Sequence, residues 1–409
     1  MGWKSWRAAR RRRREETLER PQYGWLWKPL LGLLALYLLV CLALGIWWSQ
    51  PPAPFDVEQA TLERRGEAAY APAARGTVSV ATLATTVETL LEKPGGYLRN
   101  DIAPPGVWLD NMPNWELGVL QQSRDLARAL PQMATGDTGH LEEALEALLG
   151  DDRDWFYPST EHRLEQAVEA LDRQLGELGA EDPGFAPGEG VAAWLAATAA
   201  RLDELSRRLA ASVGSHEALT ELAVDTETLP PRTPWYRVDD IFFEARGTGW
   251  ALAQLLEGVQ RDQADVLAAA GAEAEWERLL AELAMTQRRL WSPVVLNGSG
   301  FGVFANHSLV MALHMTRARD LAAALAERLA EPPQALAAPP AEDAVEAPVE
   351  PPVVEVEHHE EVAVEPPPEA LAAPEEDVAE EDVAEEEEAS PVPDEGPGLE
   401  ASEQADAPE

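Results

Sequence analysis

The chain has almost no cysteine, little lysine and only one long uncharged apolar run. Its single cysteine, Cys41, falls inside that run. The rest of the chain therefore has no thiol for a disulfide, for a nucleophile or for paired zinc ligands. We expect that part to be stabilised by packing and by non-covalent polar contacts alone.

Basic charge is scarce except at the N-terminus. The chain has 32 Lys and Arg against 73 Asp and Glu, and its net charge is −41. Residues 1–28 contain nine basic and three acidic residues, whereas residues 331–409 contain 27 acidic residues and no Lys or Arg. Because a chain this acidic repels phosphate backbones, we expect no nucleic-acid partner.

The long apolar run covers residues 29–50 and has no charged side chain. About 20 such residues are enough for a helix to cross a bilayer, so the run predicts a transmembrane helix. Two tryptophans and a proline pair follow, where a signal peptide would have a cleavage site with small residues. We expect an uncleaved anchor; a cleaved signal peptide and a buried core helix are the alternatives. The residues that mark this span are Pro29, Leu30, Cys41, Trp47 and Trp48.

The flanking charges predict the orientation of the span. The basic residues precede it, with five consecutive arginines at residues 10–14, whereas residues 51–70 are mixed in sign. The positive-inside rule then places the N-terminus in the cytoplasm and the bulk of the chain outside. In a Gram-negative bacterium this is a single-pass inner-membrane protein with a periplasmic domain. The arginine run also has the composition that binds anionic lipid headgroups.

After residue 76 the chain shows repeated helical patterns and hardly any strict apolar alternation. In one segment Leu164, Val168 and Leu171 recur at three- and four-residue spacing, which gives one apolar helix face. Many such helices joined by short loops predict a bundle. The predicted helices lie within residues 79–93, 111–131, 138–149, 160–178, 189–213, 239–270, 273–291 and 306–330.

Composition divides the chain into five segments. The fold class expected is mainly α, with one N-terminal transmembrane helix, an extracytoplasmic helical bundle of one or two lobes, and an acidic C-terminal tail. The tail is rich in Pro, Glu and Ala, which cannot bury enough apolar surface to order it, so it is predicted to be disordered. The segments are a basic cytoplasmic stretch at 1–28, the span at 29–50, a stalk at 51–76, the helical domain at 77–330 and the tail at 331–409.

Three blocks of unusual sequence interrupt the helical patterns. They are KPGGYLRNDIAPPGVWLDNMPNWELG at residues 93–118, TPWYRVDDIFFEARGTGWAL at 233–252 and LWSPVVLNGSGFGVFANHSLVMA at 290–312. The blocks are similar to those of a single-span bacterial inner-membrane family known only as a domain of unknown function (DUF2333). The resemblance covers residues 20–330, not the tail. It implies the topology and the helical fold, and it implies no catalytic residues.

The first two blocks place carboxylates beside aromatic rings. Glycan-cleaving clefts use this combination, because sugars stack on rings while two carboxyl groups divide the acid and base roles. Helix capping, arginine pairing and aromatic packing explain the same residues without any catalysis. The candidate carboxylates are Asp101, Asp110, Glu116, Asp239, Asp240 and Glu244, and the candidate binding rings are Trp108, Trp115, Trp235 and Tyr236.

The third block contains a glycine-rich stretch, with Asn297, Gly298, Gly300 and Asn306 as binding candidates. Glycines let backbone N–H groups approach an anion, but the stretch fits no phosphate-loop pattern and no lysine follows it. A turn that leads to a helix capped by Asn306 is the simpler interpretation. The histidines in and after this block are seven residues apart, about 10 Å along a helix, which is too far to share one ion. No metal site and no cofactor are predicted.

Three functions agree with these features. The first is a non-enzymatic envelope protein, anchored in the lipid bilayer by one span, whose helical domain binds other envelope proteins. The second is a protein that binds or cleaves peptidoglycan or another glycan, and the third is a sensor of a ligand or metal. Convergence of the three blocks on one surface with unpaired carboxylates would favour a ligand-binding or catalytic role, and burial of the blocks would favour a scaffold.

Overall fold

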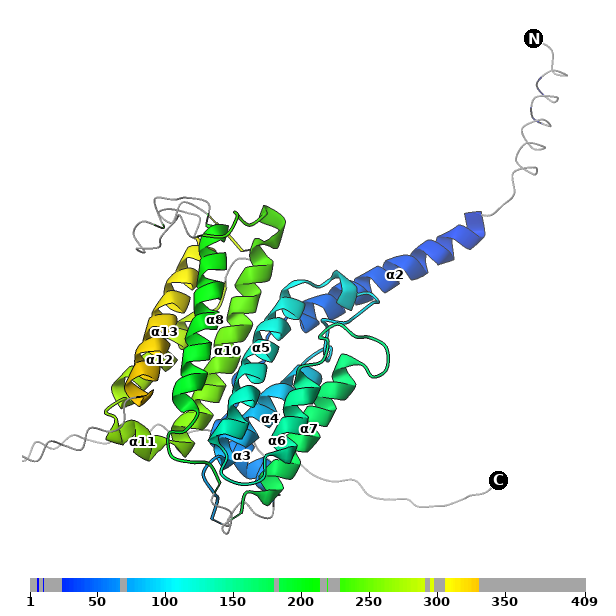
Figure 1. The fold of residues 1–409 in the computed structure, drawn as a ribbon. Helices are drawn as coiled ribbons and strands as arrows, with labels where there is room; N and C mark the ends of the chain where they lie inside the picture. Colours follow the sequence, from blue (N-terminus) through cyan, green and yellow to red (C-terminus); the bar gives the residue numbers. More distant parts are fainter. Residues whose placement is uncertain are drawn as a thin grey trace, which may run out of the picture. The chain divides into compact units, whose positions relative to one another are not determined.

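The computed structural model describes residues 24–66, 72–179, 184–213, 229–290, 295–297 and 306–330, with the single residues 6, 10 and 219. Across these residues the chain is built of helices and has no β-strand, which confirms the predicted mainly α fold (Figure 1). All of them belong to one compact unit. The predicted acidic tail and most of the predicted basic N-terminal segment lie outside the described residues.

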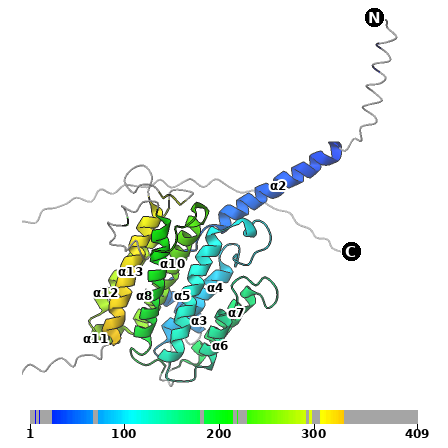
Figure 2. The same ribbon diagram turned by 45° about the horizontal axis from the view of Figure 1, so that its top comes forward.

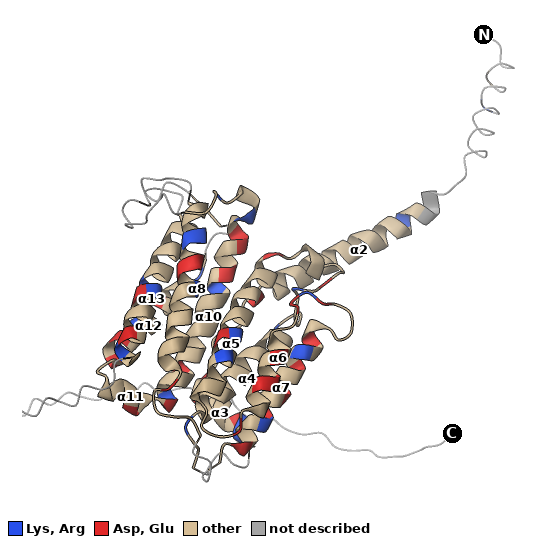
Figure 3. Ribbon diagram, viewed as in Figure 1, with Lys and Arg blue, Asp and Glu red and all other residues tan. Residues whose placement is uncertain are grey.

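The first described helix, α2 (Gly24–Trp48), contains the predicted span. Residues Trp27–Trp48 are long and apolar enough to cross a membrane, and a signal sequence would pass the same test. Figure 3 shows α2 without charge beyond its first turns. Its side chains are exposed over most of the length from residue 27 to residue 40. This exposure is what a helix surrounded by lipid would have.

The predicted stalk contains a helix that packs on the bundle. Helix α3 (Val57–Arg65) begins at Asp56, whose side chain accepts a hydrogen bond from the backbone N–H of Gln59 at 2.9 Å. Its Arg64 forms ion pairs with Glu88 and, at 2.7 Å, with Asp172 of the neighbouring helices. Part of residues 51–76 therefore belongs to the helical domain.

The remaining helices lie where the periodicity predicts them, with three differences. The helix predicted over residues 273–291 ends at Thr286. Pro131 does not end its helix, because it stands in the last turn, where the one missing N–H costs a single hydrogen bond. The predicted segment 239–270 is divided at Gln263, whose side chain bonds the chain at Gly188 and Ala186. The helices are α4 (Thr77–Glu92), α5 (Asn111–Met133), α6 (Gly139–Leu148), α7 (Thr160–Glu177), α8 (Val191–Ser212), α10 (Val238–Asp262), α11 (Ala264–Ala269), α12 (Glu273–Thr286) and α13 (His307–Ala330), with short 3-10 helices η2 (Gly106–Trp108) and η4 (Trp235–Arg237).

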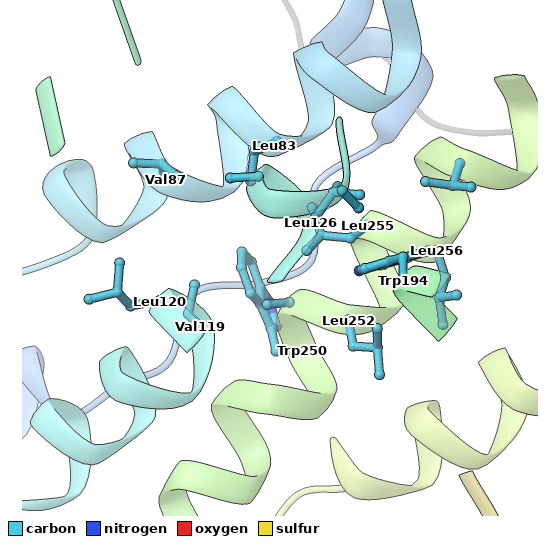
Figure 4. Packing of buried hydrophobic residues seen from close by; sticks show 14 of the residues in the cluster. Leu83, Val87, Val119, Leu120, Leu126, Trp194, Trp250, Leu252, Leu255 and Leu256 are labelled. Atoms are coloured by element: carbon cyan, nitrogen blue, oxygen red, sulfur yellow. The ribbon is translucent and has the colours of Figure 1, made fainter. Parts of the chain in front are cut away.

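Helix α10 lies at the centre of the bundle (Figure 2). It contacts α4 and α5 on one side and α8, α12 and α13 on the other. Helices α8 and α13, far apart in the sequence, pack along each other. One apolar core runs through these contacts; in Figure 4, Leu83 of α4, Val119 of α5, Trp194 of α8 and Trp250 of α10 are among its buried side chains.

Helices α5 and α10 cross in close backbone contact at two glycines. A Cβ added to Gly118 would lie 2.1 Å from the carbonyl oxygen of Glu244, and one added to Gly247 would lie 1.9 Å from the carbonyl oxygen of Trp115. Nothing larger than glycine fits at either position unless the two helix backbones move apart, which is costly because the obstructing atoms belong to the backbone. On the same helix pair the Trp115 and Trp250 rings pack with centroids 5.2 Å apart.

We expect Gly118→Ala or Gly247→Ala to lower the free energy of unfolding by at least about 2 kcal/mol, because the added methyl group forces the two backbones apart. Gly176→Ala is the matched control. A Cβ at this helical position meets nothing within 4 Å, so it should stabilise the protein by about 0.5–1 kcal/mol. Urea unfolding followed by circular dichroism measures both effects. Equal stability of all three variants would contradict the close crossing.

Candidate functional site at the α2 end of the bundle

The three sequence blocks gather at the end of the bundle where α2 joins it, here called the α2 end. The first block meets α2 directly, since the Cβ position of Gly45 lies 3.7 Å from the Leu109 side chain. The first and second blocks meet where the side-chain amide of Asn114 donates to Asp240 at 2.9 Å. Blocks far apart in the sequence therefore share one end of the fold.

The third block joins the same end. Its Asn297 side-chain amide donates to the carbonyl oxygen of Ser212 at 2.7 Å, at the C-terminus of α8. The ring of His307 lies 6.1 Å from that of Phe242, in the first turns of α10. Gly298 and Gly300 lie outside the described residues.

A buried ion pair closes the loop of the first block onto α5. The Nζ of Lys93 lies 2.6 Å from Glu116, and both side chains are fully buried. The carboxylate also accepts backbone N–H bonds from Leu98 at 2.9 Å and from Arg99 at 2.8 Å, and Lys93 donates to the carbonyl oxygen of Gly96. Burial raises the pKa of Glu116 to about 7, although the Lys93 charge and these hydrogen bonds oppose the rise. Glu116 is thus enclosed and has no access to a substrate.

The same loop holds the segment between α6 and α7. The Tyr97 hydroxyl donates to the carbonyl oxygen of Asp152 at 3.0 Å. Arg99 pairs with the Asp152 carboxylate at 2.8 Å. The Asn100 side-chain amide donates to the carbonyl oxygen of Asp154 at 2.8 Å. Residues 151–159 are therefore positioned at the α2 end by the first block.

Glu244 is also engaged in an ion pair between helices. Both of its oxygens accept from Arg208 of α8, at 2.8 and 2.6 Å, and the carboxylate is almost fully buried. The adjoining cavity, also lined by Gln121 and Arg201, has a volume of about 20 Å³. That is room for a single water molecule and far too little for a sugar.

Three candidate carboxylates remain accessible to solvent and lie close together. Asp110 caps α5 by accepting from the N–H of Asn111 at 2.9 Å. Asp239 and Asp240 stand in the first turn of α10. Partial burial raises the pKa of Asp239 and of Asp240, and repulsion from Asp110 raises both further. Arg237 opposes the effect on Asp240, from which it lies 3.6 Å away.

The fourth half-buried candidate, Asp101, lies apart from these three in the loop before η2. Burial raises its pKa. One of its oxygens would be 1.7 Å from a Cβ at position 106, so only Gly106 fits there. The packing of Asp101 against Gly106 therefore explains the presence of this carboxylate without a catalytic role.

The aromatic candidates divide into one buried ring and three exposed rings. Trp115 is fully buried in the core, so it is not available to a ligand. Trp108 and Tyr236 are exposed, and 87% of Trp235 is accessible. Sequence reasoning did not single out the exposed run at residues 155–157, although three consecutive aromatic residues in a predicted loop were a visible signal.

The polar residues of the third block serve the fold. The Asn306 side chain accepts from the N–H of Leu309 at 3.0 Å and so caps α13. His307 accepts from the N–H of Leu296 at 2.9 Å, whereas His314 pairs with Glu282 at 2.7 Å. Within the described residues no group of three or more metal-ligating side chains occurs.

Comparison with known proteins gives one match. A family model described as an uncharacterized protein conserved in bacteria (DUF2333) matches residues 20–331. No curated protein and no solved structure matches. The matched residues include α2, the whole bundle and all three blocks, whereas the acidic tail lies outside the match.

We expect Lys93→Met to lower the free energy of unfolding by about 3–5 kcal/mol at pH 8, because it leaves the Glu116 carboxylate buried without its partner. The loss should be smaller at pH 5, where a carboxyl group with a raised pKa binds its proton in the folded state. The double variant Lys93→Met with Glu116→Gln should regain much of the loss, because glutamine still accepts the backbone N–H bonds. Urea unfolding at both pH values measures this, and additive losses in the double variant would contradict the pairing.

Proposed function

The chain belongs to the DUF2333 family of uncharacterized bacterial proteins, and from this premise we propose that it is a single-pass inner-membrane protein whose periplasmic helical domain docks other envelope proteins. The observation that carries the proposal is the division of the polar residues at the α2 end. Two candidate carboxylates are engaged in ion pairs between elements, whereas Asp110, Asp239 and Asp240 are exposed or half-buried at the end of the bundle that also carries exposed rings.

The character of α2 supports the anchoring. Twenty-two residues, Trp27–Trp48, form one apolar helix. The exposed ring of Trp47 at its end has the amphipathic character favoured at a headgroup layer. The excess of arginine before the helix supports a cytoplasmic N-terminus.

The state of the two buried glutamates supports a non-enzymatic role. A general acid or base must reach the proton that it transfers. Glu116 is enclosed with Lys93, and Glu244 is bound by both nitrogens of the Arg208 fork. The raised pKa of Glu116 follows from its burial, and the ion pair of Glu244 joins two helices, so the fold accounts for both without a catalytic role.

Exposed and half-buried residues at the starts of α5 and α10 form a surface suited to protein binding. We call it the acidic aromatic surface, and it consists of Asp110, Asp239, Asp240, Trp235 and Tyr236. Figure 3 shows acidic residues where α10 begins. Trp and Tyr are the residue types most often found where binding energy is concentrated. Such a surface fits a partner that presents basic and apolar side chains.

Glycan binding is the second candidate, favoured by the gathering of Asp110, Asp239 and Asp240 beside exposed rings. A sugar would stack on Trp235 or Tyr236 and donate hydrogen bonds from its hydroxyl groups to a carboxylate. Isothermal titration with muropeptides distinguishes the candidates. Heat of binding that disappears on Trp235→Ala would favour the glycan, and no heat would favour the protein partner.

We expect crosslinking and purification of the tagged full-length protein from native membranes to yield a reproducible set of envelope proteins. The double variant Trp235→Ala with Tyr236→Ala should lose most of that set, since it removes the two exposed rings. Met285→Ala, a change at an exposed apolar residue of α12, is the matched control. A chain truncated after Ala330 should keep its partners.

Two results would contradict the proposed docking role. If truncation removes the partners, binding belongs to the acidic tail. If the set is equal for the Trp235→Ala, Tyr236→Ala variant and the control, the acidic aromatic surface is not the docking surface.

A further inference from the structure

We propose that the α2 end of the bundle enters the lipid headgroup layer, with the apolar side chains of residues 102–109 lying beside the last two turns of α2. The proposal rests on the membrane anchoring proposed above and adds a second contact between the protein and the bilayer. The occupant of this apolar surface is thus lipid.

The position follows from contacts between α2 and the loop. The Cβ position of Gly45 lies 3.7 Å from Leu109 and 4.0 Å from Pro105. Cys41, one turn earlier, is only 4% exposed, unlike its neighbours. These two positions precede Trp48 by three and seven residues, which is about 5 and 10 Å of helix rise. If α2 crosses the bilayer as far as Trp48, residues 102–109 lie at the boundary between lipid headgroups and acyl chains, which is where interfacial apolar segments bind.

The composition of the loop suits that layer. No charged residue occurs at positions 102–109. Ile102 is 62% exposed, and Val107 and Trp108 are also exposed. In water these side chains would keep their unfavourable hydration, whereas insertion into the bilayer boundary removes their apolar surface from water. The ring of Trp108 is of the kind enriched at membrane interfaces.

A second loop adds aromatic residues at the same end. Phe156 and Tyr157 are each 73% exposed, and Trp155 precedes them. Hydrogen bonds from the first block hold this loop in place, as with Asn100 and the carbonyl oxygen of Asp154. Three consecutive exposed rings are unusual on a surface that faces only water, and they match the aromatic belt of membrane proteins.

Two of the acidic residues next to these loops are neutralised by arginine, whereas Asp110 and Asp151 are exposed and stay on the aqueous side of the contact. Asp152 is paired with Arg99 and Asp154 is paired with Arg163. Asp101 is partly buried and its pKa is raised by that burial. Because the contact is apolar, it needs no anionic lipid, and neutral phosphatidylcholine is sufficient to test it.

The test uses the full-length protein reconstituted into phosphatidylcholine vesicles, with Cys41→Ala as background. Single cysteines are introduced by Val107→Cys and Phe156→Cys and labelled with a fluorophore whose emission reports polarity. Leu36→Cys, in the middle of α2, reports the anchor. Ala268→Cys, an exposed position on α11 at the opposite end, is the aqueous control. Lipids with a nitroxide headgroup then quench any label that lies in the interface.

We expect labels at 107 and 156 to shift to shorter wavelength and to be quenched by the nitroxide lipids, while the label at 268 shows neither effect. A blue-shifted label at 36 with unquenched labels at 107 and 156 would leave the anchor standing and overturn the lipid contact. An aqueous label at 36 would overturn the anchor and the contact together. Labels at 107 and 156 that are shielded only in native membranes would assign the loops to a protein partner, against the proposal.

Discussion

The arrangement of this protein depends on the crossing of α5 and α10, where two glycines allow the backbones to touch. Gly118 and Gly247 leave no space for a methyl group between the helices. The crossing places α10 at the centre of the bundle, with α4 and α5 on one side and α8, α12 and α13 on the other. It also brings the beginnings of α5 and α10 to the same end of the bundle. The hydrogen bond from the Asn114 side chain of α5 to Asp240 of α10 shows that the two beginnings are close.

Buried polar pairs extend that arrangement outward. On one side of the crossing Glu116 holds Lys93 and the loop that follows it, and this loop in turn holds residues 151–159. On the other side Glu244 holds Arg208 of α8. A buried pair of this kind adds little net stability compared with an apolar contact, but removing one partner is costly, so it favours one geometry over others. Of the two glutamates that looked like catalytic candidates, Glu116 thus positions the loops of the first block, and Glu244 ties α10 to α8.

Periodicity and composition were sufficient to predict most of the fold. The helices and the long apolar segment follow from apolar spacing and the absence of charge, which depend on local sequence. The continuation of α5 through Pro131 and the break at Gln263 depend on the position of a residue in its helix and on a contact with a distant loop, so local rules missed them. For the candidate site, the sequence identified which carboxylates and aromatic rings to consider. Whether each of them is available to a ligand depends on its burial in the folded protein. Trp115 falls inside the predicted helix 111–131 and is buried, whereas Trp235 falls between predicted helices and is exposed, but residue type alone does not separate them.

The central claim is that α2 remains attached and anchors the protein, so that the α2 end faces the membrane. Intact mass measurement of the protein from native membranes, after alkaline extraction, tests this directly. We predict that the chain stays in the alkali-resistant membrane fraction with a mass that includes residues 1–50. A soluble protein whose mass shows cleavage after α2 would contradict it, because the apolar helix would then be a signal sequence and the α2 end would face water.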